Sequence, residues 1–161
     1  MSRRRRASKG GITRNGLSAD IASWIADTQD KADAIVRDTL GQMAQSLVEL
    51  TPSGDPAGWL HKWEAPKGYS GGRLKANWQF GIRQRPSGVT GSVDPDGSAT
   101  VADIQGQIAD TVLGDTCYFV NNAPYALIVE YGWSKQSPAG MARLTVESWD
   151  QFVSSSVDNA S

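Results

Sequence analysis

The chain has 161 residues, of which 39% are hydrophobic and 20% are charged, and its formal net charge is −1. This length predicts a single domain with enough residues to bury a core, and no apolar run approaches the ~20 residues that a transmembrane helix needs. The polar sequence after the charged start MSRRRR argues against a cleaved secretory signal.

Basic residues concentrate at the N-terminus. Six fall within the first 14 residues, where there is no acidic residue, which leaves 10 basic and 17 acidic residues for the rest of the chain. Residues 1–15 also lack hydrophobic periodicity, so we predict a disordered basic arm. Such an arm either binds a phosphate backbone or an acidic surface, or it only solubilises the chain. The basic residues of the arm are Arg3, Arg4, Arg5, Arg6, Lys9 and Arg14.

A long amphipathic helix is predicted next, because apolar residues recur at steps of three and four from Leu17 to Val48. Thr51-Pro52 ends it, since the residue before a proline avoids helical backbone angles. Unbroken, the helix would hold about 33 residues and measure about 50 Å, more than the width of a domain of this size. We therefore expect it either to bend, with Gly41 as the weak point, or to project toward a neighbouring subunit.

Residues 52–72 are rich in glycine and proline, yet they contain two tryptophans and a tyrosine. This stretch is too aromatic for a plain linker, so we predict an insertion loop that is either ordered or becomes ordered on assembly. Its rings, Trp59, Trp63 and Tyr69, pack either on the chain's own body or on another subunit.

Two strands are predicted in the second half of the chain. Residues 73–83 alternate between apolar and polar side chains, the period of a strand with one buried face, although the first turn could be helical. Turn residues fill 85–98, where a short strand could fit, and the β-branched and aromatic run at 116–120 predicts another strand. The buried face of the first strand would hold Leu74, Ala76, Trp78, Phe80 and Ile82.

Helical spacing predicts three further helices, at residues 99–113, 125–131 and 141–157. Gly114 and Gly132 end the first two, and residues 158–161 are expected to form a flexible tail. The pattern as a whole predicts an α+β fold with one domain over residues 16–157. In it, the long N-terminal helix packs with a small antiparallel sheet and short C-terminal helices.

Candidate catalytic groups are few. The single histidine, His61, lies in the Trp-rich loop, and Ser134-Lys135 lacks the Ser-x-x-Lys spacing that places both groups on one helical face. No P-loop or dinucleotide-binding pattern is present. One cysteine, Cys117, excludes an internal disulfide and, with one histidine, leaves too few ligands for a typical zinc site. We therefore expect neither an enzyme nor a cofactor.

Residues 121–145 interleave aromatic, small and amide side chains with few charges, a mixture typical of an interface core. Tyr131 and Trp133 flank Gly132, where the backbone can turn and push a ring outward, and such rings are common interface anchors. The alternative is that both rings cap the domain's own core. The predicted subunit-interface residues are Tyr125, Glu130, Tyr131, Trp133, Ser134, Lys135, Gln136, Met141, Trp59 and Trp63.

Two stretches of the sequence carry a family likeness. The first is Asn121-Asn122-x-Pro-Tyr-Ala, continued by Glu130-Tyr-Gly-Trp-Ser-Lys-Gln-x-Pro-Ala-Gly-Met-x-Arg-Leu-Thr-Val, and the second is Thr51-Pro52 followed by Gly72-Arg-Leu-Lys-Ala-Asn-Trp. They resemble the neck, or tail-completion, proteins of long-tailed bacteriophages, over residues 17–153. The chain departs from that family where the longer Trp-rich loop replaces a short Pro-Val-Asp-Thr-Gly-Arg link, and the basic arm lies outside the resemblance.

The resemblance implies a structural virion protein that forms a ring at the head-proximal end of the phage tail. There it would complete the tail and help join it to the DNA-filled head. Its expected partners are copies of itself in a hexameric ring, a tail-terminator or tail-tube protein, and a head-side connector or stopper protein, with no membrane partner. The end of the tape-measure protein and genomic DNA would lie in the lumen, and assembly would take place in the host cytoplasm. The alternative is a nucleic-acid-binding module that acts through the Arg-rich arm.

Overall fold

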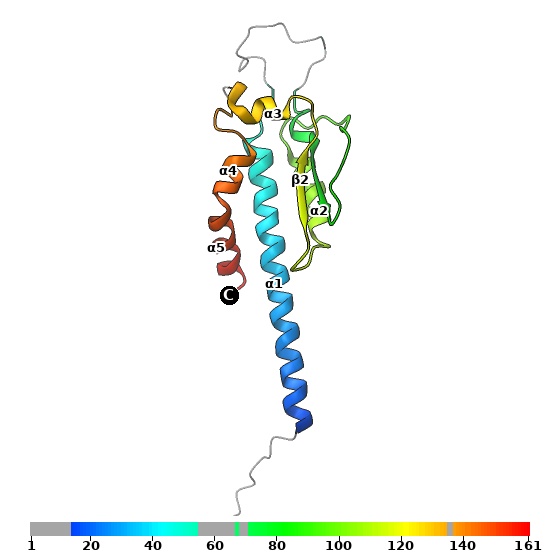
Figure 1. Cartoon of the computed structure of the whole chain (residues 1–161), viewed down its shortest axis with the longest axis vertical. Helices are drawn as coiled ribbons and strands as arrows, with labels where there is room; N and C mark the ends of the chain where they lie inside the picture. Colours follow the sequence, from blue (N-terminus) through cyan, green and yellow to red (C-terminus); the bar gives the residue numbers. More distant parts are fainter. Residues whose placement is uncertain (1–13, 55–66, 68–70, 135–136) are drawn as a thin grey trace, which may run out of the picture.

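The computed structural model describes residues 14–54, 67, 71–134 and 137–161, and its fold is α+β, as predicted. Figure 1 shows one long helix with the shorter elements gathered around its C-terminal part. Two of these elements, η2 and η3, are short turns of 3-10 and π helix. The elements in chain order are α1 (Arg14–Leu50), η2 (Lys75–Asn77), β1 (Trp78–Ile82), α2 (Ser98–Ile108), β2 (Cys117–Asn121), α3 (Ala126–Ile128), η3 (Val129–Trp133), α4 (Ala142–Glu147) and α5 (Trp149–Asn159).

Helix α1 runs unbroken for 37 residues, about 55 Å. It passes through Gly41 without a break, and a Cβ at that position would meet no atom within 4 Å. Arg14, which the sequence placed in the basic arm, begins the helix instead. Within the described ranges, no helix combines the length and the apolar character needed to cross a membrane.

The two halves of α1 have different surroundings. Residues 16–31, called here the projecting half, are exposed throughout and extend beyond the rest of the molecule (Figure 1). The C-terminal half packs against α2, α4 and α5. The helix therefore extends beyond the domain without a bend, and the neighbouring subunit that it was expected to meet stays a prediction. The buried residues of the C-terminal half are Thr39, Leu40, Ala44, Leu47 and Val48.

The core lies between the C-terminal half of α1, α2 and a two-stranded antiparallel sheet. In the sheet, Phe80 of β1 faces Phe119 of β2, and their ring centroids are 5.0 Å apart. Aromatic pairs at this separation add to the stabilisation that burial provides. The predicted buried face of the first strand is confirmed for Leu74, Ala76, Trp78 and Phe80, and Ile82 packs against them.

The first strand is shorter than the alternating pattern over 73–83 predicts. It begins only at Trp78, because Lys75–Asn77 form a turn of 3-10 helix. The side chain of Asn77 fixes this turn: its Nδ2 donates to Arg73 O at 2.7 Å, and its Oδ1 accepts from Thr90 N–H at 2.9 Å. Asn77 is fully buried, although the alternation assigned it to the solvent face.

Residues 84–97 contain no strand, but this segment runs back beside β1. Hydrogen bonds from side chains join the two segments: Thr90 Oγ1 donates to Ala76 O at 2.9 Å, and Gln79 Nε2 donates to Gly88 O at 3.0 Å. The segment therefore covers the edge of β1 that does not pair with β2.

Several helix boundaries differ from the predicted ones. Helix α2 ends at Ile108, well before Gly114, and the helix predicted at 141–157 is divided into α4 and α5 at Ser148. At the division, Ser148 Oγ donates to Leu144 O at 3.0 Å. Helix α5 continues to Asn159, into the stretch that was expected to be a flexible tail.

Thr51 links the end of α1 to the sheet. Its hydroxyl donates to Leu47 O at 2.6 Å and accepts from the indole Nε1 of Trp78 at 2.7 Å, and both side chains are buried. Thr51→Val keeps the shape of the side chain but leaves the indole N–H without its acceptor. We expect the free energy of unfolding to fall by about 1–3 kcal/mol, as measured by urea denaturation followed by circular dichroism.

Thr51→Ser is the matched control, because it keeps the hydroxyl and removes only a methyl group. A valine variant as stable as the serine variant would show that the hydrogen bond to Trp78 does not stabilise the fold.

Candidate functional site

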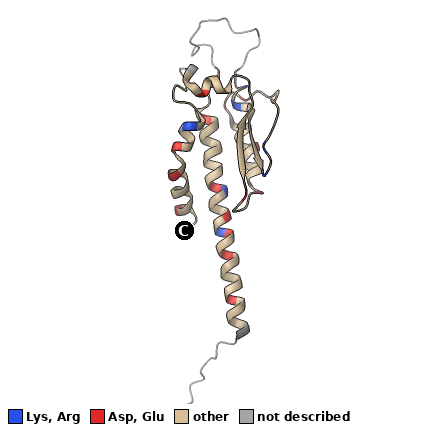
Figure 2. Cartoon of the chain, in the orientation of Figure 1, with Lys and Arg blue, Asp and Glu red and all other residues tan. Residues whose placement is uncertain are grey.

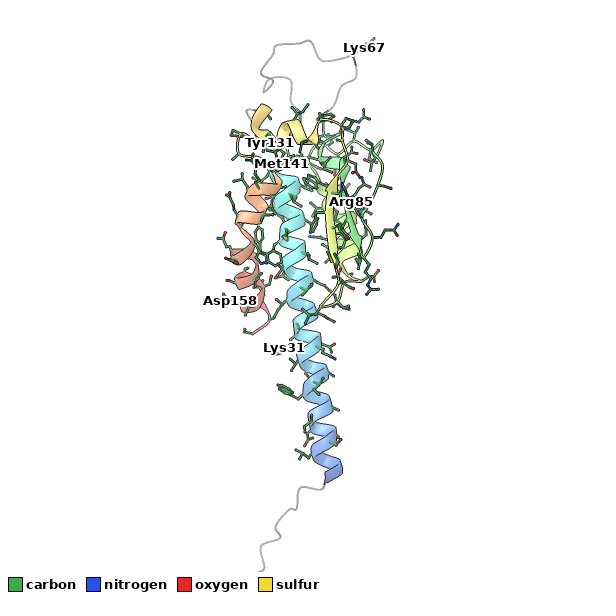
Figure 3. All side chains as sticks on the ribbon, viewed as in Figure 1. Lys31, Lys67, Arg85, Tyr131, Met141 and Asp158 are labelled. Atoms are coloured by element: carbon green, nitrogen blue, oxygen red, sulfur yellow. The ribbon has the colours of Figure 1, made fainter. Side chains whose placement is uncertain are left out.

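Residues 132–141, called here the connection, lead from the end of η3 to α4 beside the C-terminal end of α1, where Figure 3 labels Tyr131 and Met141. Two residues of this connection, Lys135 and Gln136, lie outside the described residues, as does the side chain of Trp133. Further predicted site residues that lie outside the described part of the chain are Trp59, Trp63, Arg3, Arg4, Arg5, Arg6 and Lys9.

The carboxylate of Glu130 holds the two ends of the connection together. Its Oε2 accepts from the backbone N–H of Met141 at 2.8 Å and of Ala142 at 2.9 Å, and its Oε1 accepts from Arg143 N–H at 3.0 Å. These N–H groups belong to the first turn of α4, where intrahelical acceptors are lacking. Glu130 was predicted as an interface residue, but both of its oxygens bind within the chain.

The exposed side chain of Arg143 also binds Glu130. Its Nε lies 3.3 Å from Glu130 Oε1, and its Nη2 donates to Glu130 O at 2.6 Å. Its guanidinium carbon lies 5.3 Å from the centroid of the Tyr131 ring, within the range of a cation–π contact. Arg143 was not among the predicted site residues, although its position 13 residues after Glu130 in a charge-poor stretch was visible in the sequence.

The protonation of Glu130 follows from these contacts. Burial raises the pKa of Glu130, but hydrogen bonds from the N–H groups of Ala142, Met141 and Arg143 and from the Arg143 side chain together lower it below its ordinary value of 4.5. The carboxylate is therefore ionised at neutral pH and engaged by donors on both oxygens. Such a group is unsuited to act as a general base, which needs a pKa near the working pH and a free lone pair.

Two glycines of the connection occupy positions that exclude a side chain. Gly132 has φ 90°, and a Cβ there would lie 2.9 Å from Pro138 O. Gly140 also has φ 90°, and a Cβ there would lie 2.6 Å from Glu130 Oε1. The glycines therefore set the path of the chain through backbone angles and close approach together.

The prediction that Met141 presents a contact to another subunit is wrong for this structure. Its side chain is 1% exposed and belongs to the main core cluster. The reason is the position of its backbone, which Glu130 holds against the end of η3, so that the side chain packs inward. Ser134 is half-buried at the end of η3, and its carbonyl accepts from Ser137 N–H at 3.2 Å.

An exposed apolar surface lies over α3 and η3, immediately before the connection. Two of its members, Leu127 and Ile128, were not predicted, although residues 127, 128 and 131 share one face at helical spacing. The other two, Tyr125 and Tyr131, were predicted as interface residues. The members of this α3–η3 surface are Tyr125 (39% exposed), Leu127 (67%), Ile128 (49%) and Tyr131 (68%).

Two grooves lie elsewhere on the molecule. One, of about 910 Å³, runs between α1, α4 and α5 and is lined by polar residues together with Leu50, Leu144 and Phe152. The other, of about 520 Å³, is mostly apolar and lies between α1, β2 and α5. None of the predicted site residues that the structure describes lines either groove, and no three of the described His, Cys, Asp and Glu residues come together as a metal site.

Comparisons with protein-family models, with curated proteins and with solved structures find no match to this chain. The comparisons therefore add no support for a function, and the geometry above is what the structure contributes.

Replacing Glu130 tests whether its charge holds the connection. Glu130→Gln removes the charge and one acceptor oxygen, and we expect the free energy of unfolding at pH 7 to fall by about 1–3 kcal/mol. Because the pKa of Glu130 is lowered in the folded protein, its stabilisation is complete above the unfolded pKa and is lost as the pH falls through the folded pKa. The difference between the two proteins should therefore shrink below a pH of about 4.5, as measured by urea denaturation across pH.

Glu147→Gln, at an exposed glutamate of α4, is the matched control and should change stability little. A Glu130→Gln difference that is small, or that is equal at pH 3 and pH 7, would contradict the role of the charge.

The close approach at Gly140 gives a second test. Gly140→Ala should destabilise more than Gly88→Ala, because both positions have positive φ but a Cβ at Gly88 meets nothing within 4 Å. The control should lose about 1–2 kcal/mol from backbone strain alone, and Gly140→Ala at least about 1 kcal/mol more because Glu130 must move. Thermal or urea denaturation measures both, and equal losses would show that the contact with Glu130 is unimportant.

Proposed function

We propose that this chain is a structural virion protein that assembles with copies of itself into a ring, expected to be hexameric, at the head-proximal end of a phage tail. There it completes the tail and helps join it to the head. The observation that carries the proposal is the projecting half of α1, whose apolar side chains the chain's own body leaves uncovered. Exposed apolar surfaces of this kind mark sites of association with other proteins. The placement at the phage tail rests on the resemblance of residues 121–145, of Thr51-Pro52 and of Gly72–Trp78 to neck proteins.

The distribution of exposed apolar side chains supports a protein with two kinds of neighbour. The α3–η3 surface lies at one end of the long axis, and the projecting half of α1 extends to the other end (Figure 1). A connecting protein needs separate surfaces for its own copies and for the structure that it joins. We assign the projecting half to contacts between copies and the α3–η3 surface to a tail or head protein.

The anchoring of η3 to α4 also favours binding over catalysis. Glu130 accepts from the first turn of α4, and Gly132 and Gly140 approach Pro138 and Glu130 closely, so Tyr131 is presented on an anchored segment. Binding by an ordered surface loses less conformational entropy than binding by a flexible one. The alternative function is nucleic-acid binding by the Arg-rich arm. Its support is the positive charge of residues 1–14 in the sequence.

The proposal predicts that the purified full-length protein forms closed rings, alone or when mixed with isolated tails of the phage that encodes it. Light scattering measures the mass of the assembly, and negative-stain electron microscopy shows whether it is closed. The double variant Leu127→Ser, Tyr131→Ala should still self-associate but should bind tails at least about tenfold more weakly in co-sedimentation, because it loses anchor side chains.

Val146→Ser is the control, because this valine of α4 is similarly exposed (63%) and lies outside the α3–η3 surface. A protein that remains monomeric at all concentrations and binds neither tails nor heads would contradict the proposed function.

A further inference from the structure

The projecting half of α1 carries an apolar stripe. Placed at about 100° per residue, its four large apolar side chains fall within an arc of about 100°. The same arc continues into the C-terminal half, where Ile35, Val36 and Met43 face the apolar groove beside β2 and α5. The helix thus has one continuous apolar face, which the chain covers only in its C-terminal half. The stripe consists of Leu17 (51% exposed), Ile21 (51%), Trp24 (68%) and Ile25 (46%).

The charges beside this stripe are mostly negative. Residues 16–31 contain three aspartates, Asp20, Asp27 and Asp30, and one basic residue, Lys31, at the end that joins the packed half. Figure 2 shows the acidic positions along this part of α1. By helical spacing, Asp20 and Asp27 lie on one flank of the stripe, two turns apart, and small uncharged residues lie on the other. Two such faces packed against each other would bring like charges together, which disfavours symmetric pairing.

A surface of opposite charge lies on the sheet. Residues 67–93 contain five basic residues and no acidic residue. In this range, the segment that covers the free edge of β1 exposes two apolar side chains, Val89 (46% exposed) and Val93 (51%). Arg85, labelled in Figure 3 on the side of the molecule that the sheet forms, is exposed, and so is Arg73 at the start of this region. We call Arg73, Arg85, Val89 and Val93 the basic edge.

The two arginines of the basic edge are available for an outside partner. Arg83 already pairs with Asp115 at 2.6 Å, and Lys75 Nζ lies 3.4 Å from Asp96 O. Arg73 and Arg85, by contrast, make no ion pair with any described residue. The basic edge therefore offers the combination that complements the projecting half: exposed apolar side chains flanked by unpaired positive charge.

We infer that the projecting half of α1 docks on the basic edge of a second copy of the chain. In this contact the apolar stripe covers Val89 and Val93, while Asp20 and Asp27 face Arg73 and Arg85. The two copies use different surfaces, so the contact is heterologous, and repeated addition closes into a ring when the rotation between copies allows it. The inference rests on the self-association in the proposed function and names the two surfaces that perform it.

Other occupants fit the projecting half less well. The chain's own residues 1–13 are basic, but Met1 and Ile12 are their only large apolar residues, too few to cover the stripe. A nucleic acid would be repelled by the three aspartates. The apolar groove beside β2 and α5 offers no matching charge, because the charged residue in its lining is Asp115, which is itself acidic.

Charge reversal on each surface tests the contact in the full-length protein. Asp20→Lys with Asp27→Lys, and separately Arg73→Glu with Arg85→Glu, should each weaken self-association at least about tenfold in sedimentation velocity. An equimolar mixture of the two double variants should recover association, because each reversed helix then meets a reversed edge. Association of the unmodified protein should also weaken as NaCl concentration rises.

The control is Asp103→Lys with Asp158→Lys, which makes the same charge change at exposed aspartates of α2 and α5 and should leave association unchanged. Three results would overturn the inference: self-association that is insensitive to both reversals, association lost on deleting residues 2–13 but not on reversing the edge, or an unmodified protein that is monomeric throughout. The first two results would overturn the docking contact but not the proposed ring. If the protein is monomeric, the co-sedimentation with tails decides whether the proposed function stands.

Discussion

Burial of the C-terminal half of α1 is the interaction on which the other elements depend. The remaining elements are short: η2 has three residues, each strand five and α4 six. Helices and hairpins of that length are unstable alone in water. They become stable because Leu40, Ala44, Leu47 and Val48 provide an apolar face on which α2 and the sheet pack. The position of each short element, including the connection that Glu130 holds, is therefore fixed relative to α1.

Local sequence patterns predicted the elements in which the spacing of apolar residues shows which face is buried. The steps of three and four in α1 and the alternation around Phe80 identified a helix and a strand, because each pattern records which side chains are buried. The prediction failed where a distant residue decides. Asn77 is buried and helical because Thr90 supplies its hydrogen-bond partner, and nothing in the alternation of 73–83 contains that information. The division of α4 from α5 at Ser148 likewise has no proline or glycine to signal it.

The candidate site divides in the same way. Composition identified residues 121–145 as unusual, and Gly132 was correctly placed at a turn. Composition could not separate the residues that hold the connection from the residues that face outward. Glu130 and Met141 belong to the first group, because one caps the first turn of α4 and the other packs in the core. Tyr131 belongs to the second. That distinction depends on the direction of side chains after folding, which a one-dimensional pattern does not record.

The projecting half of α1 raises the question of how an exposed apolar helix avoids indiscriminate association. Extending a helix that the packed half has already nucleated costs little free energy, so the segment can stay helical without its own tertiary contacts. Trp24 and its apolar neighbours nevertheless favour any partner that removes them from water. Asp20 and Asp27 restrict that choice, because they oppose an identical face and favour a basic one. Without these charges, pairing of two α1 helices would meet no electrostatic resistance, and a closed dimer would compete with a ring.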